Sequence, residues 1–295
     1  MPIKLGANQF GKAETRLVTV RREPDGVHHI TDLNVSTALR GDLAASHLTG
    51  DNAHILPTDS QKNTVFAFAR QQPVGEIEDF ALRLARHFVG VSEHITGARV
   101  GIDQYGWTRI AVDGQPHPHS FHRSSDEKRT TVVTVRGDQA WVVSGLRDLV
   151  VLKSTGSEFG GFQHDEYTTL PETTDRILAT AVTARWRYAR LDVDWAASFE
   201  SVRSIMLNTF AGLHSLALQQ TLYAMAEAVL TAHDEIAEVR LTLPNRHHFT
   251  VDLSPFGLDN PNEVFFAADR PYGLIEGAVL RDDAPDPGLA WEILV

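Results

Sequence analysis

The chain has 295 residues, 42% hydrophobic and 22% charged, which is enough for two globular domains with sizeable cores. Its 38 acidic and 27 basic residues give a formal net charge of −11, and no basic run offsets it, which argues against nucleic-acid binding. The absence of cysteine excludes disulfides, thiolate nucleophiles, iron–sulfur clusters and cysteine-ligated zinc.

The first half of the chain alternates strand and helix patterns. Residues 16–22 and 27–39 predict strands. A helix is expected to begin at Thr58, because residues 58–61 have the form of a capping box. A second helix is expected over residues 76–89. Its apolar residues recur at spacings of three and four, which places them on one helical face: Ile77, Phe80, Leu84 and Phe88.

Histidines gather at His117, His119 and His122, with His28 and His29 earlier in the chain. Imidazoles are common zinc and copper ligands, so this segment is a candidate metal site. No carboxylate lies at a recognisable ligand spacing, and the prolines at 116 and 118 indicate a loop. We therefore expect a solvent-exposed turn without a bound metal.

The second half repeats the order of strands, helices and strands. Gly137-Asp138 suits a two-residue hairpin turn between strands at 131–136 and 139–143, and residues 184–193 predict a strand with Trp186 and Tyr188 on one face. Residues 239–243 and 249–253 alternate as half-buried antiparallel strands do. Two helices are expected between the strands at 184–193 and 239–243, the second with Ser215 as N-cap. Their apolar faces are Phe199, Val202, Ile205, Met206, Phe210 and Leu213, and then Leu218, Leu222, Met225 and Val229.

Strand blocks interleaved with helix pairs predict an α+β fold, with helices packed on one face of antiparallel sheets. The repeated element order predicts two similar domains, at residues 1–140 and 141–295, with the boundary between 135 and 150. Composition and periodicity alone predict no activity for such a protein.

Eight short motifs carry more specific information. They are Phe10-Gly11-Lys12 and residues 58–64, 152–159, 167–170, 174–178, 219–223, 243–249 and 271–275. In this order, and over nearly the whole chain, they resemble the urate oxidase (uricase) family. The resemblance implies tandem tunnelling-fold (T-fold) domains whose antiparallel strands, from several subunits, close a β-barrel with the helices outside. It also implies a homotetramer with active sites at subunit interfaces.

The family's chemistry assigns roles to residues that would otherwise look ordinary. The resemblance implies oxidation of urate by O2 and water to 5-hydroxyisourate and hydrogen peroxide, with no cofactor and no metal. Lys12, Thr58 and His247 resemble a proton relay, which urate needs because it must lose a second proton before it reacts with oxygen. A lysine accepts a proton only when burial or a nearby cation lowers its pKa, whereas a hydroxyl passes one on and an imidazole titrates near neutrality.

The substrate pocket is likewise implied by the resemblance. Phe159 resembles the ring on which the purine stacks, and Arg176 and Gln219 resemble the clamp on its edge, which suits a forked guanidinium and a carboxamide. Asn245, with Thr58, would hold oxygen and then water. The remaining contacts come from the backbone of Asp59 and from apolar walls at Leu170, Leu218 and Ile275. Taken singly, Phe159 would be a core ring, Arg176 a surface ion pair and Lys12 an exposed lysine.

Two other functions remain open from the sequence. A metal-dependent pterin or purine enzyme on the same fold would use the histidine segment, and stoichiometric zinc would favour it. A non-catalytic purine-binding oligomer would keep the clamp without the relay, and the presence of all three relay residues argues against it.

Two departures from the family pattern limit the resemblance. Phe10 stands where the family often has Tyr, and residues 292–295 are not the Ser-Lys-Leu-type peroxisomal address of eukaryotic members. With no signal peptide and no apolar run of about 18 residues, we expect a cytoplasmic protein without membrane partners.

Overall fold

The computed structural model describes residues 2–292, apart from the side chain of Asp269. The C-terminal residues 293–295, on which the expected location partly depends, lie outside the described residues. The chain divides into two compact units that interleave along the sequence. The first comprises the residues up to 145, residues 187–196 and the residues from 284 onward; the second comprises residues 146–186 and 197–283.

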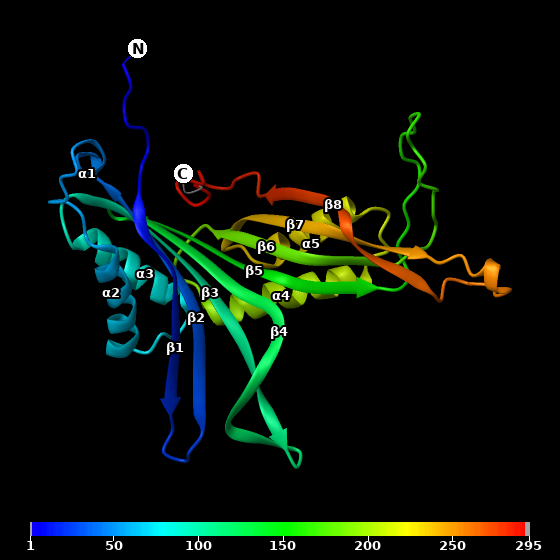
Figure 1. The fold of residues 1–295 in the computed structure, drawn as a ribbon, viewed down its shortest axis with the longest axis horizontal. Coiled ribbons are helices and arrows are strands. Elements are labelled where there is room, and N and C mark those ends of the chain that lie inside the picture. Colours follow the sequence, from blue (N-terminus) through cyan, green and yellow to red (C-terminus); the bar gives the residue numbers. More distant parts are fainter. Residues whose placement is uncertain (1, 293–295) are drawn as a thin grey trace. The chain divides into compact units, whose positions relative to one another are not determined.

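The first unit is an antiparallel sheet with helices on one face (Figure 1). The strands β1 (Phe10–Arg22), β2 (His28–Gly41), β3 (Ile95–Val112) and β4 (Gln115–Arg136) pair in chain order, and the start of β5 (Gln139–Lys153) follows β4. The helices α1 (Ala44–Leu48), α2 (Thr58–Gln71) and α3 (Ile77–Gly90) connect β2 to β3. α2 packs on β1, and α3 packs on β3 and β4.

The core of this unit is formed by apolar side chains from one face of a helix and from one face of the strands. Ile77, Phe80, Leu84 and Phe88 of α3 are all fully buried, which confirms the predicted helical face. On the strands, alternate residues are buried, as Leu33 and Val35 of β2 illustrate. The predicted two-residue turn between β4 and β5 is also confirmed, with Gly137 at φ 56°.

The second unit repeats the antiparallel arrangement. The end of β5 is followed in the sheet by β6 (Leu178–Tyr188), β7 (Ile236–Thr250) and β8 (Phe265–Leu280). The helices α4 (Trp195–Gly212) and α5 (Leu218–Ala232) lie between β6 and β7 in the chain, and the short η1 (Ser254–Phe256) precedes β8. α5 packs on β7 and β8, and the ring of Phe199 on α4 lies 6.0 Å from that of Trp186 on β6.

The fold class is therefore α+β, as predicted, but both predicted helix caps are wrong. Thr58 is the first residue of α2, the cap position is Pro57, and no side chain caps the helix. The Gln61 side chain turns inward and accepts a hydrogen bond from Thr37. In α5 the cap position is Ala217, whereas the buried Ser215 hydroxyl bonds to Thr221. At α2 a partner from β2 replaces the local cap, whereas at α5 Ser215 bonds to a side chain in the first turns of the helix itself.

The bounds of several predicted strands and the position of one predicted turn also need correction. Residues 239–243 and 249–250 belong to the single strand β7, and residues 251–253 lie beyond its end. β6 starts at Leu178 and ends at Tyr188 rather than spanning 184–193. The segment 117–122 is not a turn but part of β4, where Pro116 pairs with Ala111. The turn is Asp113-Gly114, whose φ angles of 50° and 77° are both positive, as a type I′ hairpin requires.

Within residues 2–292, no helix is long and apolar enough to cross a membrane.

Candidate active site

The predicted site residues fall into two groups, one in each unit. Lys12, Thr58 and Asp59 belong to the first unit. The second unit holds Phe159, Leu170, Arg176, Leu218, Gln219, Asn245, His247 and Ile275.

In the first unit, an irregularity in β1 positions Lys12. Lys12 pairs with Thr37 of β2, but a β-bulge separates it from the next pair, Thr15 with Val35. Gly11 is required beside it, because a Cβ at this position would lie 1.8 Å from the carbonyl oxygen of Thr37. β1 and β2 therefore approach each other unusually closely next to Lys12.

A buried polar chain links Lys12 to the start of α2. The backbone N–H of Lys12 donates to the Thr37 hydroxyl at 3.3 Å, and that hydroxyl donates to Gln61 Oε1 at 2.7 Å. Gln61 Nε2 in turn donates to the carbonyl of Leu56 at 3.3 Å. Because Gln61 and Thr37 are buried, this chain fixes the strand that carries Lys12 against the helix end that carries Thr58.

Asp59 is exposed at the first turn of α2 and is surrounded by positive charge. A hydrogen bond from Lys62 and its charge lower the pKa of Asp59, with smaller contributions from Asn63 and from the charge of Lys12. Asp59 therefore stays ionised, and its side chain is occupied by Lys62. The role of its backbone in ligand binding, which the resemblance implies, stays a prediction.

In the second unit, Phe159 and Arg176 lie together. The guanidinium carbon of Arg176 is 5.1 Å from the centroid of the Phe159 ring, a cation–π distance. The backbone N–H of Arg176 donates to the carbonyl of Ser157 at 2.8 Å, and Phe159 and Thr173 exchange backbone hydrogen bonds of 2.9 and 3.0 Å. Arg176 Nε is buried and has no hydrogen-bond partner among the described residues. A buried unpaired donor is costly, and a planar anion over the ring would satisfy it.

His247 lies close enough to Arg176 to feel its charge. Burial lowers the pKa of His247 first, and the charges of Arg176 and His248 lower it further. The imidazole is therefore neutral at neutral pH and can accept a proton. Its ring also stacks with Phe249, at 5.6 Å between centroids.

Asn245 and Ile275 come together across a glycine. Asn245 pairs with Gly273 of β8, and a Cβ on Gly273 would lie 4.0 Å from Asn245 Cβ and 3.7 Å from Ile275 Cδ1. The pairing shifts between Asn245 and His247, where one residue of β7 stands opposite residues 269–272 of β8. Residues 271 and 272, the first two of the motif at 271–275, therefore lie in a large bulge of β8.

The remaining residues occupy the start of α5 and a loop. Leu218 begins α5 and is buried, whereas Gln219, in the first turn, is exposed. Leu170 lies in the segment between Phe159 and Thr173 with 49% of its surface exposed. Leu218 is therefore as buried as the wall of a pocket would be. Leu170 would become buried only against a ligand or a partner chain.

Sequence reasoning missed the contacts that join the Phe159 loop to α5. Ser157 forms a parallel bridge with Ser215, Glu158 N–H donates to the carbonyl of Ser215 at 2.8 Å, and His214 Nε2 lies 2.7 Å from Glu158 Oε1. These pairs are more than 50 positions apart in the chain, so no spacing rule could find them. They join the loop that carries Phe159 to the start of α5.

The histidine segment of β4 does not form a metal cluster. The rings of His117 and His119 meet edge to face at 4.5 Å. Between residues 2 and 292, one group brings three candidate ligand atoms within 4.8 Å of one another, and it is Asp42, His54 and His94. Among the described residues, the segment that raised the metal-site alternative is therefore not the one that gathers candidate ligand atoms.

Comparison with known proteins gives one family. The uricase family profile matches residues 8–134 and 142–276. A uricase from Arthrobacter globiformis is 55% identical over 98% of this chain and 94% of its own, and one from Aspergillus flavus is 41% identical over 93% and 96%. The crystal structure of the Arthrobacter globiformis uricase superposes with a TM-score of 0.92 at 53% identity, over 97% of this chain and 98% of that one.

These matches cover both units and every predicted site residue, and they do not favour the metal-dependent alternative. The catalysed reaction is accordingly an oxidation of urate. The chain belongs to the uricase family and is a urate oxidase.

Proposed function

We propose that the chain oxidises urate with O2 and water to 5-hydroxyisourate and hydrogen peroxide, using its own residues and no cofactor. The observation that carries this proposal is the group of Phe159, Arg176 and His247. It combines an aromatic face, the guanidinium of a half-buried arginine whose buried Nε–H has no partner among the described residues, and an imidazole held neutral. Such a group suits a planar anion that must lose a proton.

Binding uses the second unit. The urate monoanion lies flat on Phe159, with Arg176 and Gln219 on its edge and Leu170, Leu218 and Ile275 around it. Offset stacking of aromatic faces contributes about 0.5–1.5 kcal/mol beyond burial, and the guanidinium can donate twice to the anion. Gln219 is in the first turn of α5, where free backbone N–H groups also favour negative charge.

Proton transfer comes first, and electron transfer follows from the dianion that it produces. The Lys12–Thr58–His247 relay takes a second proton from urate, and the resulting dianion transfers one electron to O2, which avoids the spin-forbidden two-electron step. The two radicals combine near Asn245, and the relay returns its proton to the new peroxide oxygen to give a hydroperoxide. Hydrogen peroxide leaves and water adds, so that urate, O2 and H2O give 5-hydroxyisourate and H2O2. The protein contributes positioning, proton transfer and electrostatic stabilisation.

We further propose that the chain works as a homotetramer in which the two groups of site residues meet between protomers. Support comes from the end strands of the sheet, β1 and β8, which each have one strand neighbour in the chain. Unpaired strand edges with exposed apolar side chains are typical of interfaces. The apolar side chains at these edges are Val18 and Val20 on β1, and Phe266, Tyr272, Leu274 and Leu280 on β8.

The proposal is tested by urate absorbance and peroxide production in chelator-treated buffer. Lys12→Ala and Thr58→Ala are expected to lower kcat by about 10²-fold or more with little change in KM, whereas Arg176→Ala mainly raises KM. Lys4→Ala, an exposed lysine outside both groups, is the matched control and keeps wild-type rates. Wild-type turnover by Lys12→Ala would refute the relay. A requirement for added metal would refute cofactor-free chemistry, and a monomer in light scattering would refute the shared site.

A further inference from the structure

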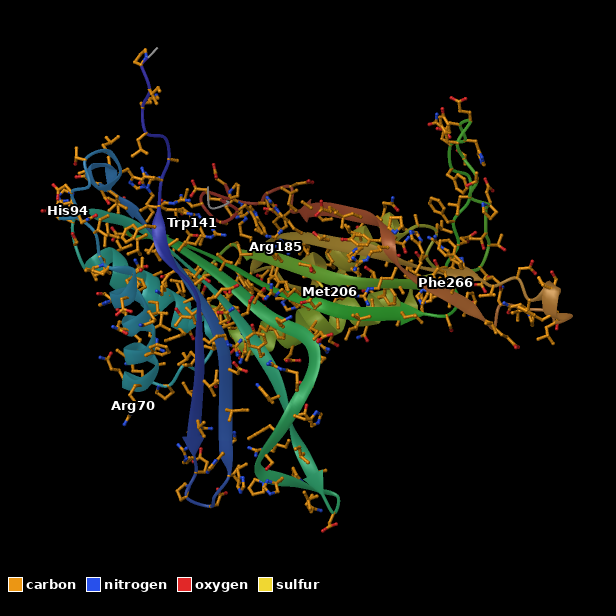
Figure 2. The ribbon with its side chains drawn as sticks, in the orientation of Figure 1. Arg70, His94, Trp141, Arg185, Met206 and Phe266 are labelled. Carbon is orange, nitrogen blue, oxygen red and sulfur yellow. The ribbon has the colours of Figure 1, made fainter. Side chains whose placement is uncertain are left out.

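Three side chains from separate segments of the first unit converge at one point. Asp42 follows β2, His54 precedes α2, and His94 lies between α3 and β3. His54 Nδ1 is 3.4 Å from Asp42 Oδ2, and His94 Nδ1 is 3.9 Å from the same oxygen. Figure 2 shows His94 at the end of the unit where the segment containing α1 lies. None of these residues belongs to the groups described above.

The backbone holds this cluster in place. Asp42 N–H donates to the carbonyl of His94 at 2.9 Å, and His54 Nδ1 lies 3.0 Å from the carbonyl of Asp42. Gly41 permits the close approach, because a Cβ there would lie 1.8 Å from the His94 carbonyl oxygen. The arrangement is therefore determined by packed backbone rather than by mobile side chains alone.

The imidazole rings themselves are stacked almost face to face. Their centroids are 3.4 Å apart and their planes differ by 7°. Aromatic rings prefer offset or edge-to-face contacts, so a close parallel stack indicates that something else places the two rings. The Nδ1 atoms of both rings lie near the same carboxylate oxygen. Two imidazoles and one carboxylate form a set of ligands that is found in transition-metal sites.

We propose that Asp42, His54 and His94 bind a divalent transition-metal ion of the zinc type. Two ligand atoms at about 2.0–2.1 Å from a tetrahedral ion are roughly 3.3 Å apart. His54 Nδ1 and Asp42 Oδ2 already have nearly this separation, and His94 Nδ1 needs to approach Asp42 Oδ2 by about 0.6 Å, from 3.9 Å to roughly 3.3 Å.

The surroundings allow that adjustment. The side chains are 68% exposed for Asp42, 34% for His54 and 33% for His94, which leaves room for ring rotation and for water as a further ligand. At His54, the ion replaces the hydrogen bond between Nδ1 and the carbonyl of Asp42. Bound there, it ties the end of β2 and the start of β3 to the segment that leads into α2, four residues before Thr58.

The test measures zinc binding to tag-free, chelator-treated protein by isothermal titration calorimetry, with unfolding temperature as a second readout. The wild type is expected to bind one equivalent per chain and to unfold at a higher temperature with zinc. His94→Ala and His54→Ala should weaken binding by at least about tenfold, since loss even of a residue that only hydrogen-bonds to a metal ligand costs about 10–100-fold. The matched control is His119→Ala, which removes an exposed histidine from β4 and should bind as the wild type does.

The outcomes separate the alternatives. Equal binding by the wild type and His94→Ala, or no binding by the wild type, overturns the proposal and leaves the cluster a stacked, hydrogen-bonded pair. Loss of binding in His119→Ala alone would place the ion on β4 instead and also overturn it. Urate oxidation in chelated buffer is scored separately, so the result for this site does not depend on the proposed reaction.

Discussion

Arg129 is the counter-ion of a carboxylate from which water is excluded. Glu78 on α3 is fully buried, and its oxygens are 2.7 Å from Arg129 Nη2 and 2.6 Å from the Ser144 hydroxyl. Arg129 also pairs with Glu76 at 2.7 Å. Burial raises the pKa of Glu78, and the charge of Arg129 and the hydrogen bond from Ser144 oppose that rise. We therefore predict that Arg129→Met, which keeps the stem but removes the charge, is strongly destabilising.

The magnitude follows from the burial of both partners. The Arg129 side chain is 14% exposed and Glu78 is 0% exposed, so removing the cation leaves the buried Glu78 carboxylate without its counter-ion, with only neutral hydrogen-bond donors such as the Ser144 hydroxyl to stabilise it. Breaking such a pair costs about 3–5 kcal/mol. At roughly 2 °C per kcal/mol for a chain of this size, the unfolding temperature should fall by about 6–10 °C.

The pH dependence has a definite sign. The folded-state pKa of Glu78 lies above its ordinary value of 4.5, so between these two pKa values the folded chain binds more protons than the unfolded chain. This contribution to stability falls as pH rises through that window. In Arg129→Met the folded-state pKa rises further and the window widens. Lowering the pH from 8 toward 5 should therefore recover part of the loss relative to the wild type.

The assay is urea and thermal unfolding of the wild type, Arg129→Met, and the double variant Glu78→Gln with Arg129→Met. A neutral amide needs no counter-ion, so the double variant should regain much of the lost stability. A double variant no more stable than Arg129→Met, or a loss under about 1 kcal/mol, would show that the buried charge is not the reason.

Three further changes probe the site and the core. Gly11→Ala places a methyl group 1.8 Å from the Thr37 carbonyl oxygen, so β1 must shift and urate turnover should fall severely while circular dichroism shows a folded chain. Arg176→Gln removes a charge that lowers the pKa of His247, so that pKa should rise in an NMR titration of the ring. Phe80→Ala removes a fully buried ring and should cost about 3–5 kcal/mol in urea unfolding.

Each of these changes has a matched control. Gly6→Ala meets no atom within 4 Å and should retain activity, so equal loss in both glycine variants would contradict the crowding argument. Arg246→Gln leaves the two charges that act on His247 in place, and an unchanged titration in Arg176→Gln would show that Arg176 does not act on the ring. Phe66, 41% exposed, should tolerate alanine far better than Phe80 does.

Local pattern was a good guide wherever burial on one face determines structure. The spacing of apolar residues predicted α3 to within one residue at each end and identified its buried face. It also predicted the turn at Gly137, the buried face of α5 and most of the buried face of α4, although Ile205 is only half-buried and Leu213 lies beyond the end of that helix. Periodicity succeeds here because a helix buries one face, and that face is formed by apolar residues only three or four positions apart in the sequence.

Pattern failed where a distant partner decides. The capping box predicted at residues 58–61 is absent because the buried Thr37 hydroxyl bonds to Gln61. The N-cap predicted at Ser215 fails for a nearer reason, because its hydroxyl bonds to Thr221, which lies within α5. β7 seemed to be two strands, since only its pairing with β8 shows that it continues through the irregularity near Asn245. The prolines that indicated a loop at 116–118 are accommodated in the β3–β4 hairpin, whose turn lies at Asp113-Gly114.

For the site, the sequence by itself determined which side chains are present and, through eight ordered motifs, which family they resemble. Only the tertiary structure placed Arg176 over Phe159 and beside His247, joined Glu158 to His214, and brought Asp42, His54 and His94 to one point. The reason is physical: charge, desolvation and ligand geometry act over a few ångströms, and residues tens of positions apart reach that range only after the strands and helices between them have packed.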